Sequence, residues 1–243
     1  MHSLLPRSLF VLALTALTTT GCRFGPLHAV RGNGHIVQED RSVGSFQSIE
    51  SNGFMNIYLT QGETTGVRLE GESNVLKYVD TRVEDGKLIV ETLRNISLDV
   101  SHDLNVYVTL PKLTDVTLSG SGNIIGKTQL TSDQPIDFTL SGSGDVKADV
   151  DAPQVKSMLN GSGKVELQGQ TRDLKVEIAG SADFYGDGLK SENAHISILG
   201  SGDAHVFSSV KLDVTIAGSG DIYYSGDPAV TSNIYGSGSL KKK

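Results

Sequence analysis

The chain has 243 residues, a formal net charge of −7 and no tryptophan. An acidic protein of this kind does not bind nucleic acid through its overall field, so nucleic acid is excluded as a partner. Glycine is abundant, at 28 residues, and aromatic residues make up only 6% of the chain. This composition favours short strands and tight turns over helices, in one large β domain or two small ones.

Residues 1–21 have the pattern of a secretory signal peptide. Arg7 precedes an apolar run over residues 9–17, and small or polar residues follow as far as Gly21. The apolar run is too short to span a bilayer. A buried N-terminal strand is the alternative, but the polar β pattern that comes next fits it poorly. We therefore expect an exported protein.

Cys22 is the only cysteine of the chain, so no internal disulfide can form. Gly21-Cys22 at the end of a signal resembles the lipobox of bacterial lipoproteins, although Thr19 departs from the leucine usual there. The resemblance implies that Cys22 becomes the lipid-modified first residue and anchors the protein to a membrane. Ordinary signal cleavage nearby is the alternative. Arg23, which is not aspartate, implies the outer membrane by the sorting rule of enteric bacteria. Residues 22–31 would form a short tether.

Seven Gly-Ser-Gly-type turns fill the C-terminal half at intervals of 22, 19, 19, 20, 18 and 18 residues. Apolar and polar residues alternate before each turn, as Ile136, Phe138 and Leu140 do before Gly142, which marks a strand with one buried face. These ordered patterns exclude a flexible Gly/Ser linker. The first glycines of the seven turns are Gly120, Gly142, Gly161, Gly180, Gly200, Gly218 and Gly236.

A repeat of 18 to 22 residues matches one coil of a parallel β-helix. We predict an all-β, single-stranded parallel β-helix of about seven C-terminal coils with a less regular N-terminal β portion. It forms one domain over residues 32–240, followed by a basic tail at 241–243. A β-sandwich of hairpins has the same periodicity, but copies that align in one direction favour the solenoid. Lysines at the open edge would discourage pairing with another chain.

The turn glycines are predicted to be structural. The parity of the strand places both glycines of a turn inward and the serine between them outward. Ala182 replaces the second glycine of one copy, which indicates that this position needs a small side chain. The first glycine is never replaced, so a positive φ is expected there.

The N-terminal half carries weaker signals. Residues 32–37 and 51–59 look like eroded copies of the turn. Ser73 could cap a short helix over residues 74–80. Asp85-Gly86 predicts a hairpin turn between strands 81–84 and 87–92.

The order of these motifs resembles the head GIN domain, a family labelled putative auto-transporter adhesin. The motifs are Arg41 with Phe46 and Ile49, then Gly53 with residues 57–62, then residues 83–90, and then the Gly-Ser-Gly-Asp turns. The resemblance covers nearly all of the chain after the signal. It implies a right-handed β-helix on a bacterial envelope protein and supplies no catalytic motif.

An acidic residue follows four of the turns, at Asp145, Asp183, Asp203 and Asp221. The last three belong to consecutive coils and should stack on the outside, where a Ca²⁺ ion could bridge them. Aspartates that accept hydrogen bonds from turn amides are the alternative, and no cofactor is expected.

Two other sets of polar residues are candidates for binding a ligand. Histidines 35, 102, 195 and 205 show no zinc spacing, and His195 and His205 are expected to be ordinary surface residues. The serine column could offer hydroxyls to a glycan, or could consist of turn residues that bond locally. It comprises Ser121, Ser143, Ser162, Ser181, Ser201, Ser219 and Ser237.

Together these features favour a non-catalytic envelope lipoprotein that acts as an adhesin-like or structural module, with a glycan or a protein as ligand. The alternative is a carbohydrate-active β-helix enzyme, a polysaccharide lyase or hydrolase. Such enzymes carry long loops that build a cleft, whereas the coils here are near minimal length.

Overall fold

A computed structural model describes residues 28–243 as strands joined by tight corners, with one short 3₁₀ helix. The predicted signal peptide and Cys22 lie outside these residues. No helix within 28–243 is long and apolar enough to cross a membrane. The N-terminal elements are β1 (His28–Arg31), β2 (Ile36–Arg41), β3 (Ser48–Gly53), β4 (Asn56–Gln61), β5 (Gly66–Glu72), η1 (Leu76–Tyr78), β6 (Val79–Glu84), β7 (Lys87–Thr92), β8 (Ile96–Asp99) and β9 (Asn105–Leu110).

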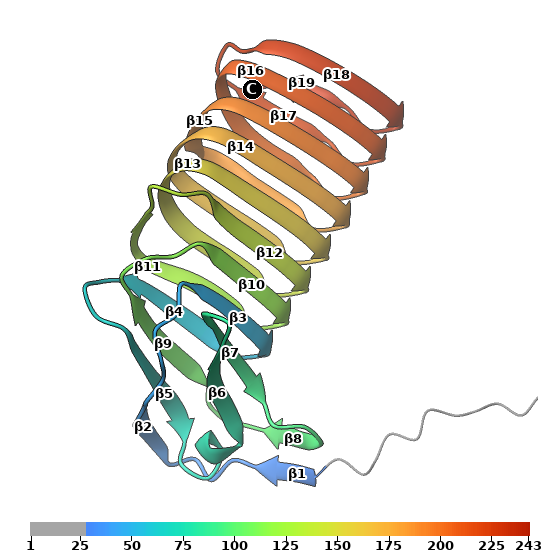
Figure 1. Ribbon diagram of the computed structural model, residues 1–243. Coiled ribbons are helices and arrows are strands. Elements are labelled where there is room, and N and C mark those ends of the chain that lie inside the picture. The colour runs from blue at the N-terminus through green and yellow to red at the C-terminus, as the bar shows by residue number, and fades with distance from the viewer. Residues whose placement is uncertain (1–27) are drawn as a thin grey trace, which may run out of the picture.

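The C-terminal half is a parallel β-solenoid (Figure 1). The seven predicted glycine turns delimit about six full turns of it, one fewer than the seven coils expected. Its strands are β10 (Asp115–Gly120), β11 (Asn123–Thr131), β12 (Ile136–Gly142), β13 (Asp145–Gly161), β14 (Lys164–Gly180), β15 (Asp183–Gly200), β16 (Ala204–Gly218), β17 (Ile222–Ser225), β18 (Ala229–Gly236) and β19 (Leu240–Lys242).

Each coil has two straight sides that face each other across the core. One side stacks β10, β12 and the second halves of β13 to β16, and ends at β18. The other side stacks β11 and the first halves of β13 to β16, and ends at β17 and β19. Two corners join the sides: the glycine corner, which holds the predicted turns, and an opposite corner around residues 151–154, 170–173, 190–193 and 207–211.

The core consists of columns of inward side chains, because the period of two puts every second residue inside and the stacking aligns them coil on coil. Burying each aliphatic side chain contributes about 1.5–3 kcal/mol. One buried column runs from β10 to β16, through Leu118, Leu140, Leu159, Ile178, Ile198 and Ile216.

The N-terminal half caps this stack, and its strands do not stack in chain order. β3 and β4 form a further coil beneath β10 and β11. The chain then lays β7 and β9 beneath β3 and β4, both parallel. Finally, β6 pairs with β7, β5 pairs with β9, and β2 pairs with β5, all antiparallel. The apolar end of the core is therefore closed at this end of the molecule (Figure 1).

A buried carboxylate holds the cap together. Glu72 accepts hydrogen bonds from the amides of Gly34 and Ser101, at 2.6 and 3.1 Å, and from the Ser101 hydroxyl at 2.8 Å. Burial raises the pKa of Glu72, but these hydrogen bonds outweigh it and the pKa lies below its usual value. The carboxylate thus ties the 31–35 segment to the cap.

Several N-terminal expectations need correction. Residues 28–31, assigned to the tether, form β1, which pairs with β8. Residues 32–34 are not a copy of the turn, because they contact Glu72 rather than stack on a coil. The helix shrinks to η1, whose N-cap is Val75, and the Ser73 hydroxyl accepts a bond from the Asn33 side chain instead.

Two N-terminal predictions are confirmed. Gly53 lies beneath Gly120 in the stack and has a φ of 143°, so residues 51–53 are an eroded copy of the turn. The hairpin joins β6 to β7 through Asp85 and Gly86, whose φ angles of 49° and 76° fit a type I′ turn.

Candidate functional site

The glycine corner is held by hydrogen bonds that run along the solenoid axis. In each copy the carbonyl of the first glycine accepts a bond from the serine amide of the next coil, as Gly180 does from Ser201 at 2.8 Å. Gly180 also accepts a bond from the amide of Gly202 at 3.2 Å. Successive corners are therefore in direct backbone contact.

This contact leaves no room for side chains at either glycine. A β-carbon on Gly200 would collide with the carbonyl oxygen of Gly180, and one on Gly202 with that of Ala182. The first glycines have φ angles between 124° and 151°, with the exception of Gly161, whereas the second glycines do not have a positive φ. The strand parity had predicted that both glycines face the core, but the missing side chains point at the backbone of the coil beneath.

The serines of the corner face solvent, and all seven are exposed. Their amides, rather than their hydroxyls, make the bonds between coils. The hydroxyls form an outward column along the glycine corner.

The aspartates after the turns form a ladder of side-chain to backbone bonds. Asp183 accepts a bond from the amide of Asp203 at 2.9 Å, and Asp203 accepts one from the amide of Asp221 at 2.7 Å. Asp221 in turn accepts bonds from the amide and hydroxyl of Ser239. Each carboxylate therefore caps a backbone donor of the next coil.

The end of the ladder is also ion-paired. The ammonium of Lys241 lies 2.6 Å from Asp221, and this contact, followed by the Ser239 bonds, lowers the pKa of Asp221 from 3.8 to about 2. Within residues 28–243, no three His, Cys, Asp or Glu side chains are grouped so that they could hold a metal ion.

His205 is not the ordinary surface residue that was expected. Its ring lies between those of Tyr185 and Tyr223, at centroid distances of 5.1 and 4.8 Å. Its Nδ1 lies 2.7 Å from the ammonium of Lys243 and 3.4 Å from a carboxylate oxygen of Asp187. The three rings occupy one register position of successive coils, which an alignment of the repeats on their glycines could have found. His195 is exposed.

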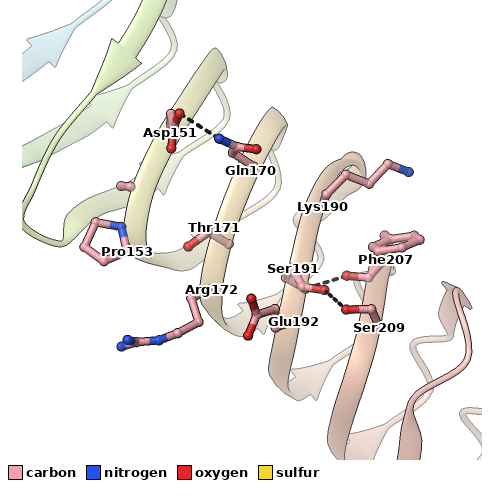
Figure 2. A pocket seen from close by; sticks show the side chains of 11 residues that line it. Asp151, Pro153, Gln170, Thr171, Arg172, Lys190, Ser191, Glu192, Phe207 and Ser209 are labelled. Atoms are coloured by element: carbon pink, nitrogen blue, oxygen red, sulfur yellow. Dashed lines mark hydrogen bonds between the residues drawn. The ribbon is translucent and has the colours of Figure 1, made fainter.

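The opposite corner of the solenoid carries a shallow groove of about 410 Å³ that crosses β13, β14, β15 and β16 (Figure 2). Sequence reasoning missed it, because its residues are not adjacent in the chain and form no motif. Its lining comprises Asp151, Ala152, Pro153, Gln170, Thr171, Arg172, Lys190, Ser191, Glu192, Phe207 and Ser209.

A column of small hydroxyl residues forms the floor of the groove. Thr171 and Ser191 line the groove, and Ser208 continues their register position in the next coil; all three are buried. Their hydroxyls donate to corner carbonyls, as Ser191 does to Phe207 and Ser208 does to Lys211. The strand needs these donors because the chain bends here and leaves carbonyl groups without partners in the sheet.

The rim carries polar and charged groups of both signs. Arg172, Lys190 and Glu192 are exposed, and the ammonium of Lys190 lies 4.1 Å above the ring of Phe207. Asp151 accepts a 2.8 Å bond from the Gln170 side chain (Figure 2). Two acids and two bases leave the groove without net charge, so it is suited to a neutral polar chain rather than to an anion or a cation.

Comparison with known proteins supports this description of the molecule. The model of the family described as "Putative auto-transporter adhesin, head GIN domain" matches residues 45–228. No curated protein matches the chain.

Solved structures share the fold at low sequence identity. A putative adhesin from Bacteroides fragilis superposes with a TM-score of 0.81 at 21% identity, over 88% of this chain and 100% of its own. A putative lipid binding protein from Parabacteroides distasonis has a TM-score of 0.75 at 21% identity, over 89% and 100%. A putative adhesin from Parabacteroides merdae has a TM-score of 0.65 at 23% identity, over 88% and 99%.

Proposed function

Because the chain belongs to the head GIN domain family, we propose that it is a non-catalytic, adhesin-like module of the bacterial cell envelope that binds a glycan in the groove across β13 to β16. The observation that carries the proposal is the groove itself. Its rim offers donors and acceptors in a row, one set from each coil, over a floor whose hydroxyls are already satisfied.

The dimensions of the groove suit a polymer. Four coils about 4.8 Å apart give a polar strip about 14 Å long, which is the length of a few sugar residues. The Lys190 ammonium, which lies over the Phe207 ring, offers hydrogen-bond donors at the rim, while Gln170 and Glu192 can bond to sugar hydroxyls. A glycan with regularly spaced hydroxyls would meet a side chain at the equivalent position of each coil.

The proposal includes a membrane anchor. Lipidation of Cys22 in an outer membrane protein would place the solenoid at a surface, and residues 23–27 would join it to β1. Intact mass of the protein extracted from membranes tests this: a mature chain that begins at Cys22 and carries acyl mass supports the anchor. Any other starting residue, or a mass without acyl chains, contradicts it.

Binding can be tested with a panel of immobilised neutral and acidic polysaccharides and fluorescently labelled protein. Lys190→Ala is expected to weaken retention at least tenfold, because it removes the cation at the rim. Lys127→Ala is the matched control, since Lys127 lies over the ring of Tyr58 at 5.2 Å but outside the groove. Equal retention of both variants would contradict the groove as the site.

The alternative of a polysaccharide lyase or hydrolase is tested on the same panel. We expect no release of reducing or unsaturated sugar from any polysaccharide that the protein retains. Release that is abolished by Glu192→Gln would replace the binding module with an enzyme in the same groove.

A further inference from the structure

The two ends of the solenoid are finished differently. At the N-terminal end the outermost strand, β2, carries Glu39, Asp40 and Arg41, and charged edge strands resist pairing with other chains. At the other end β18 pairs with β16 on one side only (Figure 1). Its eight residues, Ala229–Gly236, include neither a charged residue nor a proline.

β18 also leaves the end of the core uncovered. Val230 and Ile234 continue the inward columns above the buried Leu212 and Ile216. They are 41% and 40% exposed, whereas the residues beneath them are completely buried. A strand laid on β18 would therefore bury apolar side chains as well as satisfy its free backbone groups.

The lysines of the tail, which the sequence predicted would discourage pairing at this edge, are ion-paired within the chain. Lys241 is paired with Asp221 and Lys242 with Asp227, at 2.6 and 3.0 Å. The ammonium of Lys243 lies 2.7 Å from a carboxylate oxygen of Asp187 on β15, three coils below β19. All three ammonium groups are thus held by acids of the chain's own coils and neutralised there.

We propose that β18 pairs with β18 of a second copy of this chain, so that two solenoids join end to end at their C-terminal coils. A two-fold axis perpendicular to the flat sides reverses each strand and keeps its inner face inside. The same rotation brings β18 against β18 and β19 against β19. The pair is antiparallel, and the two cores become one.

Symmetry and the pleat together select the register. In an antiparallel pair, residues directly opposite each other point to the same face, so an inward residue must oppose an inward residue. In a two-fold pair, one residue of the strand then lies directly opposite its own copy, next to the axis; this residue is called axial. With Ser232 on the axis, Val230 lies opposite Ile234 and both are covered; with Asn233 there, Val230 would lie opposite Gly236. Ser232 is therefore the axial residue.

An uncharged strand suits pairing with itself. Like charges opposite each other destabilise a sheet, and this register brings no charges of β18 together. Lys241 and Lys242 of β19 do face their copies across the junction, and each is ion-paired with an acid of its own chain. The eight-residue edge supplies about eight backbone hydrogen bonds across the junction, since one residue contributes about one bond in an antiparallel pair. A closed pair also removes both edges, so the assembly stops at two copies.

Sedimentation velocity of the full chain is the first test, in a Cys22→Ser background that removes the single thiol. The expected result is a mass of two copies that falls to one copy on dilution. A single-copy mass at every concentration, or open-ended polymers, would overturn the proposal.

Charged substitutions locate the interface. Ile234→Lys is expected to give single copies, with an unchanged circular dichroism spectrum. Leu199→Lys is the matched control: Leu199 is 64% exposed but lies two coils below, at the glycine corner, so this variant should still pair. If Ile234→Lys pairs as tightly as the parent chain, β18 is not the interface.

A cysteine on the axis tests the register without disturbing the apolar contact. Opposite residues of an antiparallel pair have Cα atoms about 4.5–5.5 Å apart, within reach of a disulfide. In the Cys22→Ser background, Ser232→Cys should form covalent pairs on mild oxidation, and Leu199→Cys should not. Pairs that form in sedimentation but fail to cross-link through Ser232→Cys would exclude the two-fold at this residue.

Discussion

The carbonyl oxygen of Gly180 occupies the place where a β-carbon of Gly200 would stand, because that oxygen accepts the bonds from Ser201 and Gly202. The same relation joins Gly200 to Gly218, and Gly218 to Gly236. Glycine at this position therefore lets the carbonyl groups of one corner approach the next corner at the coil spacing of a sheet.

The first prediction concerns the two glycines of one turn. Gly200→Ala combines a collision with a φ of 142°, and Gly202→Ala has a collision alone. Both are expected to destabilise the solenoid by about 1–3 kcal/mol, with Gly200→Ala the larger effect. Chemical denaturation measures this, and Gly44→Ala, with open space around it, is the control. A neutral Gly202→Ala would show that the corner can shift.

Such a shift is visible at Ala182. A β-carbon on Gly180 would lie 2.7 Å from the carbonyl oxygen of Gly161, which is farther than at the other solenoid corners. One alanine is therefore accommodated by displacing its own corner.

The second prediction concerns pH. The folded-state pKa of Asp221 is lowered to about 2, so its ion pair and hydrogen bonds stabilise the fold above the ordinary pKa of 3.8. This contribution is lost as the pH falls from 3.8 towards 2. Asp221→Asn should lower the thermal midpoint at pH 7 and lose less of it between these pH values. If the thermal midpoints of Asp221→Asn and of the parent chain fall by the same amount over this pH range, Asp221 does not have this role.

The third prediction separates capping from metal binding in the aspartate ladder. Asp203→Ala is expected to cost about 1 kcal/mol, because the amide of Asp221 loses its acceptor. Ca²⁺ and a chelator should both leave the thermal midpoint of the parent chain unchanged. A calcium-dependent rise that Asp203→Ala abolishes would instead establish the ladder as a metal site.

The fourth prediction concerns two buried serines. The Ser157 hydroxyl has no hydrogen-bond partner in the part of the chain that the structure describes, and its column places it between Phe138 and Val176. Ser157→Ala should stabilise the fold by about 1 kcal/mol, because an unsatisfied polar group leaves the core.

Ser191→Ala is the matched contrast for this test. The Ser191 hydroxyl donates to the carbonyl of Phe207, so its removal is expected to destabilise the fold by about 1 kcal/mol. Denaturant midpoints of the two variants should move in opposite directions. Equal shifts would show that burial, and not bonding, decides the effect.

Much of the architecture could be predicted from single residues and their spacing. The glycine turns recur at nearly constant intervals, and Leu140 and Ile178 alternate with polar neighbours, so a stacked β coil was the simplest arrangement. The Asp85-Gly86 hairpin followed from turn chemistry alone. These are local properties, which a sequence states directly.

The cap was less predictable. Nothing in the order of β3, β7 and β10 says that β3 lies between the other two. Ser73 had a cap residue's chemistry, but the chain extends into β6 at Val79 and leaves one turn of 3₁₀ helix. Competition between local helix capping and pairing with β7 was decided by the sheet.

The amino-acid sequence by itself determined the repeat, the inward columns and the position of each glycine corner, because period and steric demand act within one coil. Only the tertiary structure decided why Gly200 must be glycine, where the groove lies and how the open end is finished. Each of these depends on contacts between residues of neighbouring coils, such as Gly180 with Gly200 and Lys190 with Phe207. Stacking creates those contacts, and no local pattern encodes them.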